Sequence, residues 1–455
     1  MVNLLLSIVS GVLLSAAFAP FSIWWLAPIG IALHMYGISR CTRPFLNSFV
    51  FALVFNAITL HWTSIYVGSV PWIFLFVGQA ALFFPLGLVK KYGISFYPFI
   101  FLIAEEVRAR FPFGGFGWLR IAFSQADAPY RNLAAIGGAS ALTATVLSLA
   151  LAIFSLMQRR FNLVALLPLL LLLITIPTHQ VGTLNVLMVQ GDVPQLGLDF
   201  NSRATAVFFN HIKETKKALA KNSDVDLILW PENAVDVDPF TNSEVSQALN
   251  ELDKPLILGA VIRSHGELQN ASIHWTKSEQ NVYLKQHLTP FGEYIPLRGI
   301  ASKISPFVDS VEDFSPGKTA VVFKEKTATI APVICFELID DQILSDAAKA
   351  SHLIVVQTNS ATFGTSSESA QQLAISRIRA IEHGRNILSV STTGVSATIT
   401  HQGIVDQQTK MHAPEHIFVD AKLLDSQTPR DKAGDWALVI TMAWLVILAR
   451  RRLNT

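Results

Sequence analysis

Eight long apolar runs constrain the fold of this chain more than any other feature of its sequence. Runs of roughly 17 to 25 apolar residues, or slightly fewer with help from their flanks, are long enough to cross a bilayer as helices. Of the 455 residues, 51% are hydrophobic and only 15% are charged, which is too apolar for a soluble protein. We therefore expect a multi-span α-helical membrane domain of eight helices. The runs lie at residues 3–18, 22–39, 45–67, 70–89, 92–108, 133–157, 161–177 and 434–450.

Charged residues divide the chain into two regions. Residues 1–177 contain ten basic residues (Lys and Arg) and three acidic residues (Asp and Glu). The rest of the chain contains 25 basic and 30 acidic residues. We expect a transmembrane domain of seven spans at 1–177, a water-soluble domain at 178–433, and an eighth span with a basic tail at 434–455.

Ala17-Phe18-Ala19 has the form of a signal-peptide cleavage site. Because no basic start precedes it and a second span follows at once, we expect the first span to stay attached.

Lys and Arg beside the runs predict an orientation, because short cytoplasmic connections are rich in basic residues. Both termini are expected to be cytoplasmic, and the domain between the seventh and eighth spans to be exported. Four basic clusters fall on one side, namely Arg40 with Arg43, Lys90 with Lys91, Arg159 with Arg160, and Arg450 to Arg452. The connection after the fifth run is an exception, with Arg108, Arg110, Arg120 and Arg131 on the outer side. Glu105 and Glu106 share this stretch, so it marks a functional pathway or holds arginines that extend to lipid head groups.

From about residue 181 the pattern changes to short strands that alternate with amphipathic helices. This alternation indicates an α/β sandwich. The expected strands are 184–189, 226–230, 255–262, 320–323, 327–335, 353–358, 387–392 and 396–400, and the expected helices are 202–220, 243–252, 341–349 and 366–384.

One of the expected strands ends in a thiol, Cys335, which is one of only two cysteines. The other, Cys41, is expected on the opposite side of the membrane, so the two should not pair. A lone Cys is often only a small buried hydrophobe. A nucleophilic Cys needs a base and a fixed cation to hold the oxyanion. Glu232 follows the strand-like run 226–230, and Lys285 follows Tyr283-Leu284, so together they supply both groups.

These motifs make the chain similar to the bacterial apolipoprotein N-acyltransferases, membrane enzymes that carry a nitrilase-like (carbon-nitrogen hydrolase) domain. The resemblance covers almost the whole chain and includes the Glu232, Lys285 and Cys335 motifs. It also rests on Pro20-Phe21, on Gly115-Phe116-Gly117-Trp118 and on the stretch from Val189 to Gln195. It implies an α-β-β-α sandwich with two sheets inside layers of helices, inserted between spans seven and eight.

The resemblance also implies roles for particular residues. Glu232, Lys285 and Cys335 would be base, oxyanion cation and nucleophile, while Glu293 would be a second carboxylate beside Lys285. Glu337 matches the family too, and it would share a face with Cys335 if the strand continued beyond the thiol. Phe336 stands where the family often has Tyr. Phe116, Trp118, Phe291 and Tyr294 are candidates for lipid entry or substrate binding.

The implied reaction transfers an acyl chain from a membrane phospholipid, through a Cys335 thioester, to the α-amino group of a diacylglyceryl-cysteine at an apolipoprotein N-terminus. The partners are therefore two lipid-anchored substrates and the bilayer of the bacterial cell membrane, with a monomeric enzyme and no nucleic acid. No cofactor or metal is expected, because His287, His383 and His401 lack metal-ligand spacing.

The chain departs from the family pattern at Ser360 and Thr362, where Asp and Trp are usual, at Gln372, where His is usual, and at Thr393, where Asn is common. A Trp common near residues 198–200 is missing, while Arg379-Ala380-Ile381-Glu382 is kept. These changes leave the preferred phospholipid open. Two rival functions also remain: a membrane-attached amidase or nitrilase that acts on a soluble C–N bond, and a non-enzymatic transporter or scaffold.

Overall fold

The computed structural model describes residues 2–193, 200–264, 266–303, 308 and 312–453. The chain forms two compact units, Met1–Ile176 with Thr428–Thr455, and Pro177–Gln427. The first boundary is one residue from the expected position. The second precedes the expected position by several residues, because the short helix α14 (Pro429–Ala433) packs on α8 (Leu133–Met157) within the first unit.

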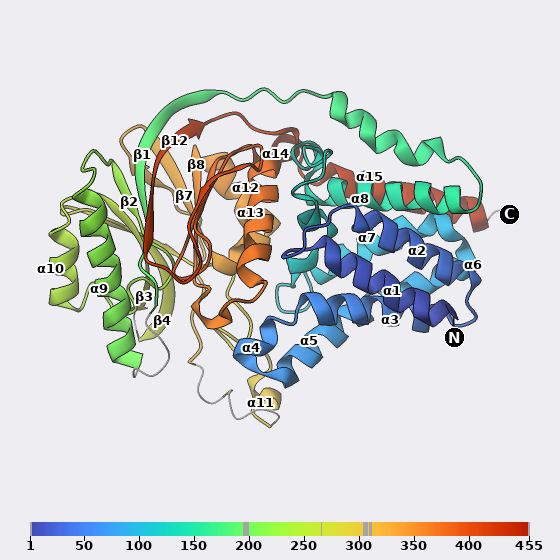
Figure 1. Ribbon diagram of the computed structural model, residues 1–455, viewed down its shortest axis with the longest axis horizontal. Helices are drawn as coiled ribbons and strands as arrows, with labels where there is room; N and C mark the ends of the chain where they lie inside the picture. Colours follow the sequence, from blue (N-terminus) through green and yellow to red (C-terminus); the bar gives the residue numbers. More distant parts are fainter. Residues whose placement is uncertain (1, 194–199, 265, 304–307, 309–311, 454–455) are drawn as a thin grey trace. The chain divides into compact units, whose positions relative to one another are not determined.

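The first unit is helical wherever long apolar runs occur (Figure 1). Pro44 at the start of α3 and Pro98 in the first turn of α7 begin helices at positions where a missing N–H costs little. Helix α1 packs on α2 and α3, and α8 packs on α2 and α7. The helices are α1 (Val2–Ala17), α2 (Leu26–Arg40), α3 (Pro44–Thr59), α4 (Thr63–Val67), α5 (Ser69–Ala81), α6 (Val89–Tyr92), α7 (Tyr97–Arg108), α8, α14 and α15 (Trp436–Leu453), with 3₁₀ segments η1 (Phe84–Leu88), η2 (Ile94–Phe96), η3 (Gly117–Leu119), η4 (Ile121–Gln125) and η5 (Leu163–Leu173).

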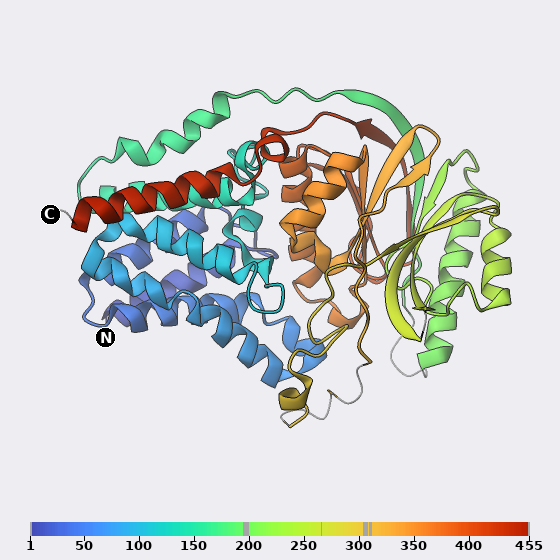
Figure 2. The same cartoon turned by 180° about the vertical axis from the view of Figure 1, so that it is seen from behind.

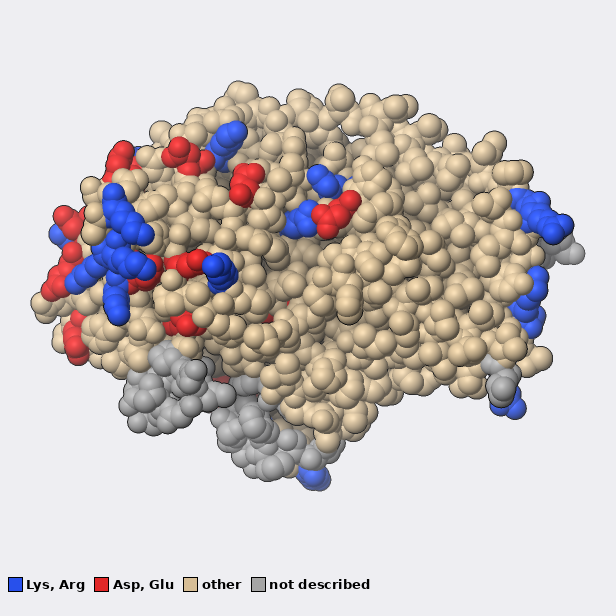
Figure 3. Space-filling model, viewed as in Figure 1, with Lys and Arg blue, Asp and Glu red and all other residues tan. Residues whose placement is uncertain are grey.

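Two helical stretches of this unit, Ser69–Tyr92 and Leu133–Met157, are long and apolar enough to cross a membrane. Shorter apolar helices lie at Val2–Ala17, Pro44–Thr59, Leu163–Leu173 and Trp436–Ile447. The seventh expected span contains the 3₁₀ segment η5, with Pro168 inside it, in place of a long α-helix. The side of the unit seen in Figure 3 carries almost no charge, and Lys and Arg gather at one end.

The second unit is built on two six-stranded sheets. Their strand orders are β12-β1-β2-β3-β4-β5 and β11-β10-β9-β8-β7-β6. The strands of the first sheet are β1 (Gln180–Gln190), β2 (Leu227–Leu229), β3 (Leu256–Ser264), β4 (Glu267–Trp275), β5 (Gln280–Leu284) and β12 (Glu415–Leu424). Those of the second are β6 (Phe323–Glu325), β7 (Ala328–Ile334), β8 (Leu353–Thr358), β9 (Ile387–Ser391), β10 (Ala397–Ile399) and β11 (Val405–Gln408).

Side-chain alternation along β1 explains why the unit has four layers. Leu184, Val186 and Met188 face the second sheet and pack with its strands β7, β8 and β9. Leu187 and Val189 point the other way and join the core beneath the helices α9 (Phe200–Leu219) and α10 (Ser243–Asn250). Helices α12 (Asp341–Ala350) and α13 (Glu368–His383) cover the second sheet (Figure 2). The unit is thus the expected α-β-β-α sandwich. It also contains the short helix α11 (Arg298–Ala301) and the 3₁₀ segments η7 (Cys335–Ile339) and η8 (Ala361–Phe363).

Parallel pairing brings strand ends to common edges of the two sheets. Strands β1, β2 and β3 run parallel, as do β7, β8 and β9, whereas the outer strands are antiparallel. The residues after β2, β5 and β7 carry the predicted base, cation and nucleophile. Pro194 and Gln195 of the stretch that opens this domain, and residues 198–199, lie outside the described residues.

Candidate active site

Cys335 lies on a sharp turn directly after β7. The strand ends at Ile334, and residues Cys335–Ile339 form η7, so the strand does not continue as the alternation argument for Glu337 required. The φ angle of Cys335 is 47°, a left-handed conformation that is uncommon for a residue with a side chain. Such backbone conformations occur often at functional sites. The turn places Cys335, a half-buried residue, at the buried end of β7.

Glu337 holds this turn in place. Its Oε2 accepts a hydrogen bond from the Ile334 N–H at 2.7 Å, and its Oε1 accepts from the Gln286 N–H at 2.6 Å and the Tyr283 hydroxyl at 2.7 Å. The side chain is fully buried, and burial raises its pKa to about 7 although these donors act against the rise. Glu337 therefore links the turn at residues 335–339, called the nucleophile turn below after the predicted role of Cys335, to the segment that carries Lys285. This structural role does not depend on sharing a face with Cys335.

Lys285 follows β5 and reaches two buried carboxylates. Its Nζ lies 2.9 Å from the carboxylate of Glu293 and 3.3 Å from Oε1 of Glu232. The side chain of Lys285 is 1% exposed, and burial alone would lower its pKa. Glu232 and Glu293 outweigh burial and raise the pKa of Lys285, so its ammonium stays charged. The sequence-predicted cation and both predicted carboxylates thus meet in one ion-paired group.

Asn270, on β4, fixes the same two carboxylates. Its Nδ2 donates to Oε1 of Glu232 at 2.8 Å and to Oε1 of Glu293 at 2.7 Å. Glu293 is held further by the Thr289 N–H, which lies 2.7 Å from its Oε2. At Gly259 of β3, a Cβ atom would lie 2.5 Å from Cα of Glu232, so only glycine lets the strand approach so closely. Close packing of β3 therefore constrains the backbone at Glu232, in addition to the hydrogen bonds that hold its side chain.

Electrostatics keep the Cys335 thiol protonated in the resting protein. Desolvation of the sulfur is the largest effect, and together with the charge of Glu232 it raises the pKa of Cys335 well above its usual value. Lys285 lowers the pKa of Cys335, as expected from its charge, but it is outweighed. As the predicted nucleophile, Cys335 would need a base at the moment of attack.

Comparison with known proteins decides which family this site belongs to. The profile of the apolipoprotein N-acyltransferase N-terminal domain matches residues 10–152, and that of carbon-nitrogen hydrolases matches residues 188–420. An apolipoprotein N-acyltransferase of Mycolicibacterium smegmatis is 31% identical over 96% of this chain and 82% of its own length. The chain belongs to the apolipoprotein N-acyltransferase family.

A more distant relative agrees with this assignment over nearly its whole length. The apolipoprotein N-acyltransferase of Photobacterium profundum is 25% identical over 99% of this chain and 96% of its own length. Among solved structures, Nit3 of Saccharomyces cerevisiae, of the nitrilase superfamily, is similar with a TM-score of 0.41 and 16% identity over 55% of this chain and 93% of that chain. That likeness is too distant to carry an argument. The family assignment makes the chain an N-acyltransferase of the nitrilase superfamily and a membrane enzyme.

Helix α13 contributes two further groups to the site of this N-acyltransferase. Gln372, one of the departures from the family pattern, lies 3.6 Å from the Cys335 Sγ through its Nε2. One turn earlier on the same face, Glu368 begins the helix and interacts electrostatically with Cys335. Sequence reasoning missed Glu368 and Asn270. Helical spacing from Gln372 is the signal that could have found Glu368.

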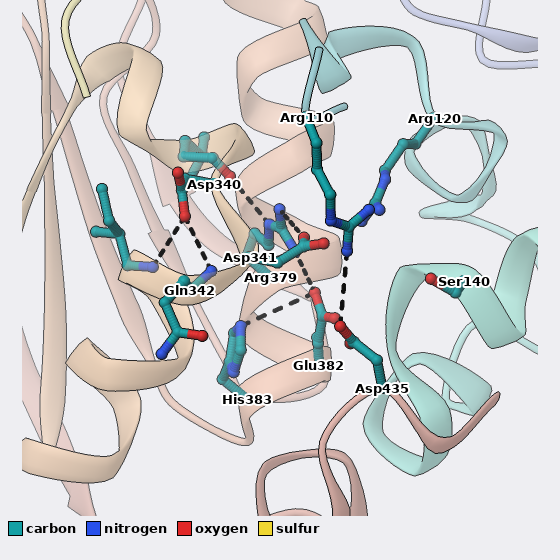
Figure 4. Close-up of polar contacts among 12 residues, drawn as sticks. Arg110, Arg120, Ser140, Asp340, Asp341, Gln342, Arg379, Glu382, His383 and Asp435 are labelled. Carbon is teal, nitrogen blue, oxygen red and sulfur yellow. Dashed lines mark hydrogen bonds and ion pairs between the residues drawn. The ribbon is translucent and has the colours of Figure 1, made fainter. Parts of the chain in front are cut away.

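Buried ion pairs fix α13 against the nucleophile turn (Figure 4). Arg379 lies 2.8 Å from Asp341 and 2.6 Å from Glu382, and its Nε donates to the Leu338 carbonyl of η7 at 2.9 Å. The Arg379 side chain is fully buried, so these partners satisfy a charge that would otherwise be costly. Arg379 and Glu382 therefore position the helix that carries Gln372 and Glu368.

The charged stretch that begins in the last turn of α7 forms a largely buried network within the first unit. Arg108 is fully buried 3.5 Å from Glu105, and Arg120 is 1% exposed, 2.7 Å from Glu106. Neither arginine can extend to lipid head groups, so that reading is wrong for both. Arg110 is 47% exposed and lies 3.6 Å from Asp435 (Figure 4).

The aromatic candidates for lipid entry differ in exposure. Trp118 is buried, with its ring 5.1 Å from that of Trp62, and Phe116 is half-buried. Their neighbours Phe111 and Phe113 are exposed. In the second unit Phe291 is exposed and has a φ of 65°, and Tyr294 is half-buried. Phe336 is buried, and its ring packs edge-on against His287.

Proposed function

We propose that this N-acyltransferase moves a fatty acyl chain from a membrane phospholipid to the α-amino group of a diacylglyceryl-cysteine through a thioester on Cys335. The observation that carries this proposal is the buried group of Glu232, Lys285 and Glu293, whose charges act on the Cys335 thiol. It offers a base, a permanent cation and a nucleophile, which acyl transfer requires.

In the first half-reaction, Glu232 takes the thiol proton as Cys335 attacks the ester carbonyl of the phospholipid. Negative charge on the carbonyl oxygen is stabilised by Lys285, whose ammonium stays charged in the buried site. The ester C–O bond then breaks, and Glu232 returns its proton to the departing lysophospholipid oxygen. The thioester keeps the acyl chain while the lysophospholipid leaves.

In the second half-reaction, the neutral amine of the acceptor attacks the thioester, again beside Lys285. Glu232 takes the proton that the nitrogen releases as the C–N bond forms, and passes it to the leaving sulfur of Cys335. Because one thiol serves both substrates in turn, the mechanism is ping-pong. Glu293 and Glu337 are positioning residues in this scheme, since they hold Lys285 and the nucleophile turn.

The membrane arrangement is part of the proposal. Eight spans, both termini in the cytoplasm and an exported second unit would bring the site to acyl chains in the outer leaflet. The apolar helices and the alternation of basic clusters support this topology. Exposed Phe111, Phe113 and Phe291 are candidates for contact with lipid, and a monomer suffices, because each of the catalytic side chains comes from one chain.

A half-reaction experiment tests the chemistry. Purified protein is mixed with phospholipid alone, the acyl-enzyme is measured by intact mass, and a diacylglyceryl lipopeptide is then added. We expect one acyl group on Cys335 that disappears on addition of the lipopeptide, and no acyl-enzyme with Cys335→Ser, because a Ser hydroxyl is far less ionised. Product without any thioester would favour direct transfer in a ternary complex. Hydrolysis of a soluble amide without acylation by phospholipid would favour the rival amidase.

A further inference from the structure

Glu368 is a buried carboxylate in the active site that the proposed chemistry leaves unused. It is 2% exposed and begins α13 one turn before Gln372, whose side chain contacts the Cys335 sulfur. One of its oxygens, Oε2, has no hydrogen-bond partner among the residues that the structure describes. An unpartnered carboxylate oxygen at this depth is costly unless a ligand completes its hydrogen bonds.

The groups that interact with Glu368 come from three places in the fold. Ser360, after β8, donates a side-chain hydrogen bond to the carboxylate, and Glu232, after β2, acts on it electrostatically. Cys335, after β7, interacts with it as well. Within the part of the chain that is described, the site's buried ammonium, Lys285, is bonded to Glu232 and Glu293. Glu368 therefore faces the thiol with a charge that no basic residue in these contacts balances.

We propose that Glu368 binds the α-ammonium group of the incoming acceptor and removes its first proton, so that the amine can attack the thioester. This inference rests on the proposed function and assigns the acceptor half of that reaction to a specific residue. The proton moves from the ammonium nitrogen to a Glu368 oxygen, and the freed electron pair forms the C–N bond. Glu232 then carries the second proton from nitrogen to the Cys335 sulfur, and Glu368 releases its proton to solvent.

Proton affinities support this division of work. Burial, the largest cause, and the charge of Glu232 raise the pKa of Glu368 to about 7. An α-amino group has a pKa of about 8, so transfer to Glu368 is unfavourable by only about tenfold. A carboxylate at its ordinary pKa of about 4.3 would be a weaker base, and the same transfer would be unfavourable by several thousandfold. Glu232 is occupied with the second proton in this scheme, and its Oε1 bonds to Lys285 and Asn270.

The test separates the two half-reactions in Glu368→Gln, with Glu251→Gln as a matched change at an exposed carboxylate. Wild-type protein must first form the acyl-enzyme, because otherwise the proposed function itself fails. We expect Glu368→Gln to form acyl-enzyme within about threefold of the wild-type rate, and to transfer the acyl group to lipopeptide about tenfold or more slowly near neutral pH. The deficit should shrink above about pH 9, where the amine is already neutral.

Hydroxylamine provides the second readout, since it is a neutral nucleophile at neutral pH and needs no base to lose an ammonium proton. Its release of the acyl group should be nearly the same in Glu368→Gln and wild type. Equal slowing with hydroxylamine and lipopeptide, or a wild-type rate with lipopeptide, would overturn the proposal, as would loss of acyl-enzyme formation in a folded variant. If the Gln variant does not fold, Glu368→Asp is used in its place. A carboxylate that acts as base should preserve the pH profile of acyl transfer to lipopeptide, at a lower rate. Slow hydroxylamine release in the Asp variant would again refute the role.

Discussion

Replacement of Asn270 by Ala tests whether the active-site carboxylates are held by the sandwich or by Lys285 alone. Asn270 donates to Glu232 and Glu293 at 2.8 and 2.7 Å, and all three side chains are buried. Nδ2 must face both carboxylates, because the amide oxygen would repel them. Hydrogen bonds to charged groups contribute about 1.5–3 kcal/mol each, which sets an upper bound of about 3–6 kcal/mol for the pair.

Two features of the structure reduce this bound. Lys285 still pairs with both carboxylates after the substitution, and the Asn270 Oδ1 is a buried acceptor with no partner among the described residues. Truncation removes that unsatisfied oxygen and recovers about 1–3 kcal/mol of its desolvation cost. We therefore expect Asn270→Ala to lower the free energy of unfolding by about 2–3 kcal/mol. For a domain of this size the unfolding midpoint should fall by about 5–10 °C.

The assay is thermal unfolding in detergent, together with the rate of acyl-enzyme formation from phospholipid. Acylation should slow by about tenfold or more, because Glu232 loses a bond that orients it. Asn250→Ala is the matched control, because Asn250 accepts one neutral hydrogen bond, from Trp275 at 3.0 Å, at the far end of β4. It should lower stability by about 1 kcal/mol and leave acylation unchanged. Wild-type stability and acylation in Asn270→Ala would refute the view that β4 positions the carboxylates.

Further predictions concern the cation, the turn, the thiol and the topology. Lys285→Arg keeps the charge but changes its shape, and it should cost about 2 kcal/mol or more of transition-state stabilisation; near-wild-type turnover would contradict the oxyanion role. Glu337→Gln places an NH₂ group against a buried N–H donor and should cost about 1–3 kcal/mol of stability. An unchanged unfolding midpoint would show that Glu337 does not hold the turn at Cys335. Because burial raises the pKa of Cys335, its alkylation without phospholipid should be slow at neutral pH and rise steeply with pH, and a plateau near neutrality would disprove a protonated thiol. In a cysteine-less background, an impermeant reagent should label a reporter cysteine at Ser278 and not at Lys90, and the reverse pattern would invert the proposed topology.

The pattern of polar and apolar residues in each strand explains which strands could be predicted from the sequence. Strands β7, β8 and β9 are rich in Ile, Leu and Val and almost entirely buried, and they end at or within two residues of the predicted positions. Strands β4, β11 and β12 were missed, and β5 was expected only as a strand-like segment that ends at Lys285. The sequences of these strands mix polar and apolar residues without a clean alternation. Asn270 and His274 of β4, for example, point into buried sites and break the pattern.

The sequence by itself determined the apolar helical region and the α/β sandwich, and it predicts Glu232, Lys285 and Cys335 as site residues, because each of these features depends on a short stretch with a recognisable pattern. Tertiary structure alone decided which side chains surround these residues. Pairing of β4 with β3 and β5 brings Asn270 to carboxylates 38 and 23 residues away in sequence. The left-handed turn at Cys335 and the anchoring of α13 by Arg379 bring Glu368 to the thiol. Such long-range contacts depend on how sheets pair and helices pack over the whole domain, and a local pattern of residues does not encode them.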